Sequence, residues 1–168
     1  MIVHPLTDDD LANRGDLTTR ADVELLVRSF YRYAAMDELL GPIFGAAQVN
    51  WDAHIATLTD FWSWQLLGER GYTGQPLRAH EPVHARTPFA DAHYERWLDL
   101  FVSTVDEHFV GNNAEQAKHR ATTMAGALRK LLRGEHGAAG EPVGPTFVLR
   151  NHQERSAAQR QRTEVGQR

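Results

Sequence analysis

Apolar residues recur at helical spacing through most of the chain. Val23, Leu26 and Phe30 are separated by three and four residues, which places their side chains on one face of an α-helix. Thr19 precedes this stripe, and threonine is one of the residues whose side chain accepts hydrogen bonds from the first backbone amides of a helix. The pattern therefore predicts a helix that begins directly after Thr19.

Three more segments show the same periodicity. The first covers residues 51–67, between Asn50, a good helix-capping residue, and Gly68, a residue type common at helix ends. The others cover residues 91–110 and 114–132. Each of these three segments is predicted to form a helix.

Two segments that contain proline are predicted to be less regular. After Asp37 we expect a short turn that is stopped by Gly41 and Pro42, because the residue before a proline disfavours helical backbone. Residues 77–86 are amphipathic and are predicted to form two helical turns, although Pro82 lies within them. Neither segment is expected to add a long helix to the core.

The helical pattern defines the predicted domain organisation. No run of alternating apolar and polar residues, which would indicate a strand, occurs before residue 140. We therefore expect one all-α domain at residues 18–134, a loose N-terminal arm at residues 1–17 and a polar, mobile C-terminal tail at residues 135–168.

Composition and charge exclude several classes of function. The 168 residues include no cysteine, which excludes iron–sulfur clusters, zinc ribbons and a catalytic cysteine. The chain has 18 Lys and Arg against 22 Asp and Glu, so it lacks the positive charge expected of a protein that binds nucleic acid. It shows neither a signal peptide nor a run of about 20 apolar residues, and we expect a cytoplasmic protein that does not enter a membrane.

Three histidines stand out as candidates for chemistry. His54 lies in the apolar stripe of residues 51–67, where it either faces a pocket or is a structural histidine bonded to a backbone carbonyl. His80 and His84 are four residues apart, so both could lie on one face of a short helix. The sequence HEPVH lacks the HExxH pattern of zinc proteases, and spacing alone does not decide which of the two binds a metal.

Two aromatic residues carry polar groups that need partners when they are buried. Tyr31 follows Phe30 on the first predicted helix, and Trp97 lies in the segment of residues 91–110. A tyrosine hydroxyl can donate a hydrogen bond, and the indole N–H of tryptophan can only donate. Together with two histidines on separate helices, these donors fit a planar apolar cofactor held between helices, with iron bound by one histidine.

Residues 17–133 resemble the truncated haemoglobins, and within them group III. The order, spacing and chemistry of four segments agree with the family: FYRYAAMDELLGPIF at residues 30–44, NWDAHIATLTDFWSWQLLG at 50–68, YTGQPLRAH at 72–80 and HYERWLDLFVSTVDEHF at 93–109. The resemblance implies a truncated globin fold, in which a two-over-two sandwich of helices encloses a haem b. It covers neither the arm nor the tail.

The resemblance also implies roles for individual residues. His80 matches the proximal histidine, which binds the iron. Tyr31, His54 and Trp97 match residues on the opposite, distal side of the haem, where they would contact a bound ligand. Six apolar residues are expected to pack against the haem: Phe30, Phe44, Leu58, Phe61, Trp62 and Phe101.

His84 is the alternative iron ligand. The chain has a few more residues between His80 and Trp97 than shorter group III members, and a gap placed differently would align His84 with the proximal histidine. We favour His80, because the string GQPLRAH that ends at this residue matches without a gap. Pro82 also predicts that the short helix ends at His80 and that His84 lies beyond it.

The function implied by the resemblance is the binding of dioxygen, nitric oxide or carbon monoxide at a five-coordinate haem iron. Hydrogen bonds from Tyr31 and Trp97 would slow the release of dioxygen. The implied reactions are nitric oxide dioxygenation and peroxide chemistry, either of which would make the protein an enzyme that depends on a separate reductase. We expect a monomer or a weak dimer.

Two other functions fit the residues without the resemblance. A helical interaction module would use its histidines only as structural residues and would bind neither haem nor iron. A non-haem metalloenzyme would combine histidines with a carboxylate, and the candidate ligands are His54, His80, His84, His93, Asp60 and Glu81.

Overall fold

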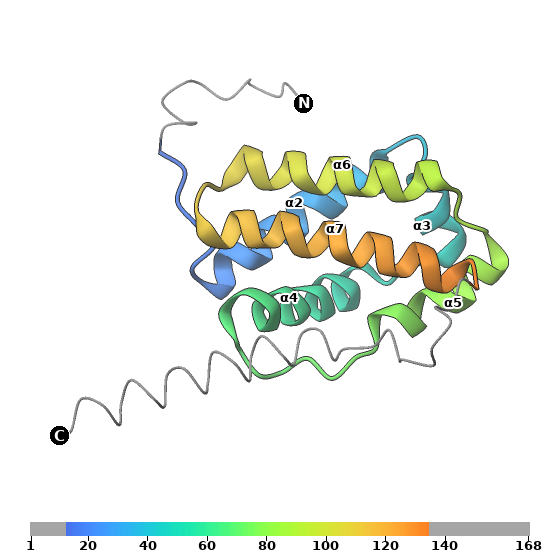
Figure 1. The fold of residues 1–168 in the computed structure, drawn as a ribbon, viewed down its shortest axis with the longest axis horizontal. Helices are drawn as coiled ribbons and strands as arrows, with labels where there is room; N and C mark the ends of the chain where they lie inside the picture. Colours follow the sequence, from blue (N-terminus) through green and yellow to red (C-terminus); the bar gives the residue numbers. More distant parts are fainter. Residues whose placement is uncertain (1–12, 135–168) are drawn as a thin grey trace. The chain divides into compact units, whose positions relative to one another are not determined.

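A computed structural model describes residues 13–134 of the chain (Figure 1). Regular structure within this range is helical throughout, which confirms the predicted all-α class. The predicted tail at residues 135–168 and the first twelve residues of the predicted arm lie outside the described residues. The helices are α2 (Arg20–Met36), α3 (Gly41–Ala47), α4 (Trp51–Leu67), α5 (Pro76–Arg86), α6 (Asp91–His108) and α7 (Asn112–Leu132).

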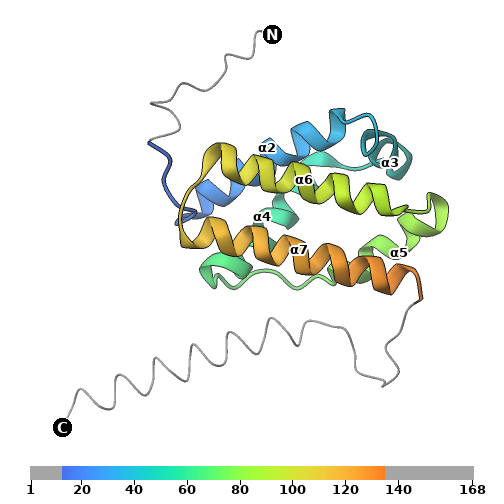
Figure 2. The same ribbon diagram turned by 45° about the horizontal axis from the view of Figure 1, so that its top comes forward.

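The four long helices pack in two pairs. α2 packs on α4 and α6 packs on α7, while contacts between α2 and α6 join the two pairs. α6 and α7 run side by side in opposite directions in both ribbon views (Figure 1, Figure 2). This arrangement agrees with the predicted two-over-two sandwich. In the part of the chain that the structure describes, no helix has the length and apolar character needed to cross a membrane.

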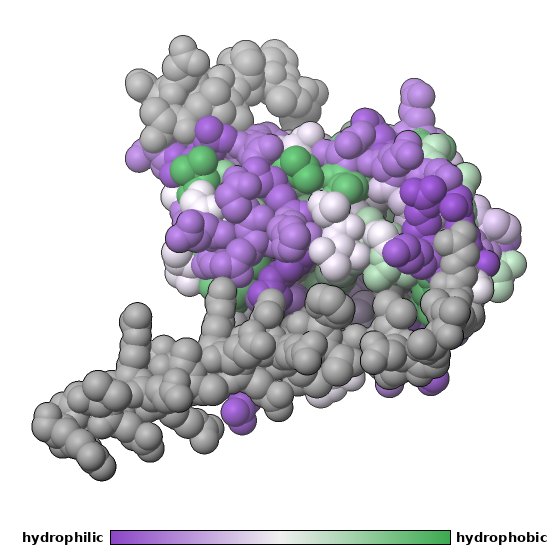
Figure 3. Space-filling model, viewed as in Figure 1, coloured by the Kyte–Doolittle hydropathy of each residue, from purple (hydrophilic) through white to green (hydrophobic). Residues whose placement is uncertain are grey.

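The core is built from the apolar stripes that the sequence pattern predicts. Val23, Leu26 and Phe30 of α2 are at most 1% exposed. Phe30 contacts Phe101 of α6, with ring centroids 5.3 Å apart. The face of α6 and α7 that is turned toward the viewer in Figure 3 carries mostly hydrophilic side chains. These helices therefore bury one face and expose the other to water.

Side chains at the helix starts act as the sequence predicts. Thr19 accepts a hydrogen bond from the N–H of Asp22 at 3.2 Å, and the Asp22 carboxylate accepts one from the N–H of Thr19 at 2.8 Å. Asn50 accepts a hydrogen bond from the N–H of Ala53 at 3.2 Å. Gly68 ends α4 in the left-handed region at φ 72°, which glycine adopts without steric cost. The boundaries of α2 and α4 thus follow from local chemistry.

Both segments that contain proline are helical: the predicted turns over residues 77–86 are confirmed, and a helix that was not predicted follows Asp37. The turn after Asp37 is present, but it leads into α3, which the sequence pattern did not predict. Pro42 lies in the first turn of α3, where the fixed φ and the missing amide of proline are compatible with a helix. α5 continues through Pro82 to Arg86, so the prediction that it ends at His80 is wrong. Pro82 removes one backbone hydrogen bond, and the rest of this short helix tolerates the loss.

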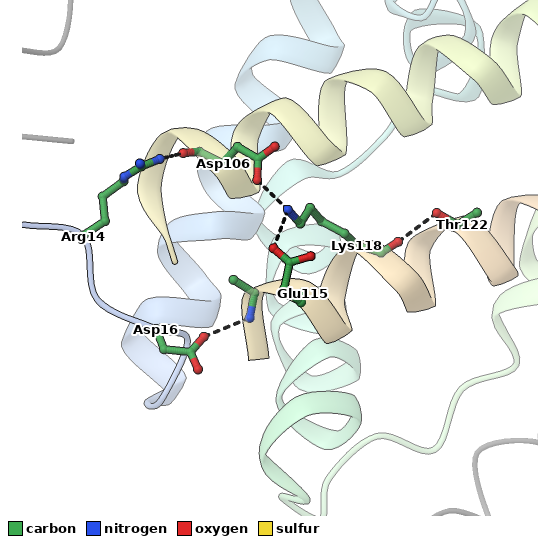
Figure 4. A network of polar contacts seen from close by, with 7 residues as sticks. Arg14, Asp16, Asp106, Glu115, Lys118 and Thr122 are labelled. Atoms are coloured by element: carbon green, nitrogen blue, oxygen red, sulfur yellow. Dashed lines mark hydrogen bonds and ion pairs between the residues drawn. The ribbon is translucent and has the colours of Figure 1, made fainter. Parts of the chain in front are cut away.

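The segment of residues 13–17 is hydrogen-bonded to the start of α7, whereas the sequence predicted a loose arm there. Leu17 is fully buried. The Asp16 carboxylate accepts hydrogen bonds from the N–H groups of Asn113 and Ala114, both at 2.9 Å, and Figure 4 shows Asp16 at the start of α7. The N-cap of α7 is a glycine, which has no side chain to accept these bonds. The carboxylate therefore supplies both the acceptors and the negative charge that favour a helix start.

An ion pair also links the end of α6 to the start of α7. Lys118 of α7 forms ion pairs with Asp106 of α6 and with Glu115 of its own helix, both at 2.7 Å (Figure 4). Arg14 donates a hydrogen bond to the backbone carbonyl of Asp106. Exposed ion pairs contribute about 0–1 kcal/mol each, so their main effect is to fix the register of the two helices.

We expect Asp16→Ala to lower the free energy of unfolding by about 1–2 kcal/mol, because two amides at the start of α7 lose their acceptor. Urea denaturation followed by circular dichroism measures the change. The matched control is Glu95→Ala, which removes an exposed carboxylate from α6 and should change the stability by less than about 0.5 kcal/mol. Equal stabilities of the two variants would contradict the role of Asp16.

Candidate functional site

Rings from α2, α3 and α4 meet in one group, which we call the aromatic cluster and which consists of Tyr31, Phe44, Trp51 and His54. Tyr31 and His54 lie edge to face, with ring centroids 5.0 Å apart. Phe44 lies 5.9 Å from Tyr31 and 5.5 Å from Trp51. The fold thus brings together three of the residues that the sequence selected, namely Tyr31, Phe44 and His54.

The Tyr31 hydroxyl is a neutral hydrogen-bonding group. Burial raises the pKa of Tyr31 well above its usual value, and a hydrogen bond with the Trp97 side chain acts in the opposite direction. Because an indole N–H can only donate, the Tyr31 oxygen is the acceptor in this bond. The hydroxyl therefore keeps its proton at neutral pH and can donate a hydrogen bond to another group.

A row of packed rings holds Tyr31 and Trp97 in place. Phe30 is 1% exposed and contacts both of them edge to face, with centroid distances of 4.7 Å and 5.5 Å. Trp97 stacks on Phe101 at 5.4 Å, and Phe101 stacks on Trp62 at 4.8 Å. Closely packed side chains have few alternative positions, so the core sets the orientation of both polar groups.

One ring nitrogen of His54, Nε2, is buried without a hydrogen-bond partner among residues 13–134. Burial lowers the pKa of His54, and the charge of His80 lowers this pKa further. His54 is therefore mainly neutral at pH 7, and the two imidazoles lie within electrostatic reach of each other. A buried nitrogen left without a partner points to a group from outside the chain.

His80 carries the complementary feature on α5. Its Nδ1 atom lies 2.6 Å from the backbone carbonyl oxygen of Pro76. A carbonyl can only accept, so Nδ1 holds the proton and the neutral ring has a free electron pair on Nε2. The side chain is exposed. His80 can therefore bind a metal through Nε2, with its ring orientation fixed by the backbone.

His84 has the opposite tautomer. Its Nδ1 atom accepts a hydrogen bond from the N–H of Phe89 at 3.0 Å, and its ring lies edge to face with Phe89 at 5.3 Å. A neutral His84 therefore carries its proton on Nε2, which leaves no free electron pair there for a metal. Both histidines lie on α5, but they differ in the backbone group that is bonded to Nδ1. This difference favours His80 as the metal ligand, because only His80 keeps a free electron pair on Nε2.

The residues expected to pack against a haem are divided between the core and its edge. Leu58 is half-buried one turn after His54, and Phe44 is half-buried in the aromatic cluster. The other four are buried in the core: Phe30, Phe61, Trp62 and Phe101. Among them, Phe61 also packs against Tyr72, in the loop after α4, with ring centroids 5.1 Å apart.

Trp51 belongs to the site although the sequence pattern alone did not single it out. It is the first residue of α4 and is 37% exposed. Its ring centroid lies 6.1 Å from that of Tyr31 and 6.1 Å from that of His54. The available signal was its position three residues before His54, on the same face of the helix. An exposed tryptophan at a helix start otherwise looks like an ordinary surface residue.

The fold does not assemble the alternative non-haem metal site. Within residues 13–134, no three His, Asp or Glu side chains are grouped so that they could hold a metal ion. Asp60 pairs with Arg20, and His93 accepts a hydrogen bond from the N–H of Ala90 at 2.8 Å. Two of the alternative ligands thus have structural partners. The remaining arrangement is one histidine with a free electron pair on Nε2, within electrostatic reach of His54, which is half-buried and whose Nε2 atom is buried.

Comparisons with known proteins agree with this geometry. No protein-family model matches the chain. The chain is 32% identical over 111 residues to the group 3 truncated hemoglobin ctb of Campylobacter jejuni, a match that covers 64% of this chain and 85% of that protein. The crystal structure of the group III truncated hemoglobin from Campylobacter jejuni aligns with a TM-score of 0.65 and 29% identity, over 74% of this chain and 98% of that chain. The chain belongs to the group III truncated haemoglobins, and it is a globin haem protein that binds gaseous ligands.

Proposed function

We propose that His80 binds the iron of a haem b and that gaseous ligands bind on the side of the haem that faces His54. The observation that carries this proposal is the pair of histidines on α4 and α5. His80 has a fixed ring with a free electron pair on Nε2, and His54 has a buried Nε2 without a partner in the described part of the chain. A globin haem uses one such imidazole as its proximal ligand.

Tyr31 and Trp97 are the hydrogen-bond donors of the proposed ligand side. When bound, haem supplies the position at which dioxygen, nitric oxide or carbon monoxide is held, together with the redox chemistry. The Tyr31 hydroxyl keeps its proton and can donate to a ligand, whereas the single Trp97 N–H is donated to the Tyr31 oxygen and reaches a ligand only by exchanging that bond. Donors that the core holds in advance stabilise negative charge on a ligand at little cost in reorganisation. We therefore expect tight binding and slow release of dioxygen.

Apolar residues at the edge of the core would contact the haem. Leu58 and Phe44 fit this role, because both are half-buried close to the proposed ligand side. Phe61 fits it less well, because its ring is already packed against Tyr72. Three buried rings would act indirectly, by holding Trp97 in position: Phe30, Trp62 and Phe101.

The proposed ligand side favours reactions of the ligand over its storage. Slow release opposes storage, whereas the neutral His54 has a nitrogen that can accept a proton and return it to a reacting ligand. We propose nitric oxide dioxygenation or peroxide reduction as the reaction. Either reaction consumes electrons, which a separate reductase would supply.

We expect His80→Gly to change the absorption spectrum of the haem-loaded protein, because the iron loses its imidazole ligand. The measurement is the position of the strong haem band at about 400 nm in the ferrous and carbon monoxide-bound states. Added free imidazole should restore the wild-type spectrum, since it can occupy the space of the deleted side chain.

His84→Gly is the matched control, because it makes the same change on the same helix. Its spectrum should equal that of the wild type. A changed spectrum that imidazole restores in His84→Gly alone would make His84 the iron ligand. A wild-type protein that takes up no haem would overturn the proposed function itself.

We expect Tyr31→Phe to speed the release of dioxygen by about tenfold, the factor that corresponds to the loss of one hydrogen bond of about 1.4 kcal/mol. Stopped-flow displacement of dioxygen by carbon monoxide measures the rate. The matched control is Tyr33→Phe on the same helix, because the Tyr33 hydroxyl instead bonds to Glu107 at 3.1 Å. Equal release rates in Tyr31→Phe and the wild type would remove Tyr31 from the ligand side.

A further inference from the structure

Two shallow hollows at the protein surface are both lined by Trp51. The first, of about 360 Å³, lies between α2 and α4, and its lining includes Tyr31, Ile55 and Met36. The second, of about 310 Å³, lies between the end of α2, α3 and the start of α4, and its lining includes Phe44. Trp51 lines both hollows and is therefore the wall that they share.

The same indole covers the ligand side that we propose for the haem. The Trp51 ring contacts the rings of Tyr31 and His54, while 37% of its own surface faces solvent. Tyr31 lines the first hollow and also carries the hydroxyl that bonds with Trp97. Tyr31 thus lies at the boundary between the hollow and the proposed ligand side, and the Trp51 ring lies beside it.

The chemistry of the first hollow suits small uncharged gases. Its accessible lining is largely apolar, although Arg28 and Arg32 also belong to it. Small uncharged gases contact apolar surface without losing hydrogen bonds, which water and ions would lose there. Two of the lining residues, Tyr31 and Trp51, contact the ring of His54.

Trp51 is placed so that its side chain can move without loss of polar contacts. It is the first residue of α4, and its contacts with the Tyr31 and Phe44 rings are aromatic packing. The helix cap is supplied by Asn50, so rotation of the Trp51 side chain leaves this bond intact. Exposed side chains change rotamer rapidly compared with most binding events.

We propose that Trp51 controls the passage of gaseous ligands from the hollow between α2 and α4 to the side of the haem that carries Tyr31 and His54. The inference rests on the proposed position of the ligand side. In this proposal the indole, in contact with the Tyr31 and His54 rings, closes the path, and a rotation of the side chain opens it. The residue thereby favours diatomic gases over bulkier ligands, which need a larger opening.

A residue that only controls passage has a kinetic signature of its own. It changes the barrier between the free and bound states and leaves the energies of these two states unchanged. Its removal therefore raises the association and dissociation rate constants by the same factor, and the dissociation constant stays constant. Loss of a hydrogen-bond donor such as Tyr31 instead raises the dissociation rate and weakens binding.

The test compares Trp51→Ala with Trp64→Ala in the haem-loaded protein. Trp64 is a partly buried residue of the same helix that stacks on Tyr72, so it controls for the loss of an indole. We expect Trp51→Ala to raise both rate constants for carbon monoxide about fivefold or more, with a dissociation constant within about twofold of the wild type. The increase should be larger for butyl isocyanide than for methyl isocyanide.

A second measurement does not depend on ligand-binding kinetics. Dissolved dioxygen is paramagnetic and broadens nuclear magnetic resonance signals of groups near which it collects. In the carbon monoxide-saturated protein, the methyl signals of Ile55 should broaden more than those of Ile43. Ile55 is the more buried of the two, so simple exposure predicts the reverse order.

Three results would overturn the inference. Rate constants of Trp51→Ala equal to those of Trp64→Ala would show that the indole does not limit passage. A changed dissociation constant with an unchanged association rate would make Trp51 a residue of the binding site. Stronger broadening of Ile43 would show that gas does not collect in the hollow. Any of these results, combined with faster dioxygen release in Tyr31→Phe, would leave the proposed function intact.

Discussion

The hydrogen bond between His80 and the carbonyl of Pro76 determines what α5 contributes to this protein. Side chains on a helix lean toward its N-terminus, so an imidazole can reach the carbonyl four residues earlier. Pro76 opens the helix, and its ring fixes the backbone φ at this point. One bond therefore sets both the tautomer and the orientation of the ring. In the proposed site, the position of the haem, and with it the role of His54 on the other side, would depend on where Nε2 of His80 points.

The two sides of the proposed haem site differ in how firmly the chain holds them. Tyr31 and Trp97 are packed against Phe30, which belongs to the buried core. On α5, by contrast, no side chain that the structure describes is fully buried, and His80 is exposed. Few apolar contacts thus hold α5, and a haem bound to His80 would add to them. In the proposed site, binding of haem and packing of α5 would therefore be linked, and the free energy of one would contribute to the other.

The helices follow from local patterns, whereas several of their connections depend on contacts that are distant in the sequence. The start of α2 could be predicted because Thr19 acts on an amide only three residues away. α3 was missed because a proline is equally compatible with a helix start and with a break, and the residues that follow decide between them. The sequence did not predict that residues 13–17 bond to α7, because Asp16 accepts its hydrogen bond from Asn113, which is 97 residues later. No local pattern encodes such a pair.

The same limit applies to the candidate site. Tyr31 and His54 could be found from the sequence, because each lies on a helix face that the core must cover. The choice between His80 and His84 could not be made reliably from spacing, because the two lie one turn apart and differ in the backbone group that meets Nδ1. Trp51 was not chosen as a site residue from the sequence for a different reason. A residue that controls passage must touch both solvent and the site, so it is neither buried like a core residue nor polar like a typical surface residue. A half-exposed ring beside a buried polar pair is the arrangement that this function requires, and it becomes visible only when exposure and contacts are known together.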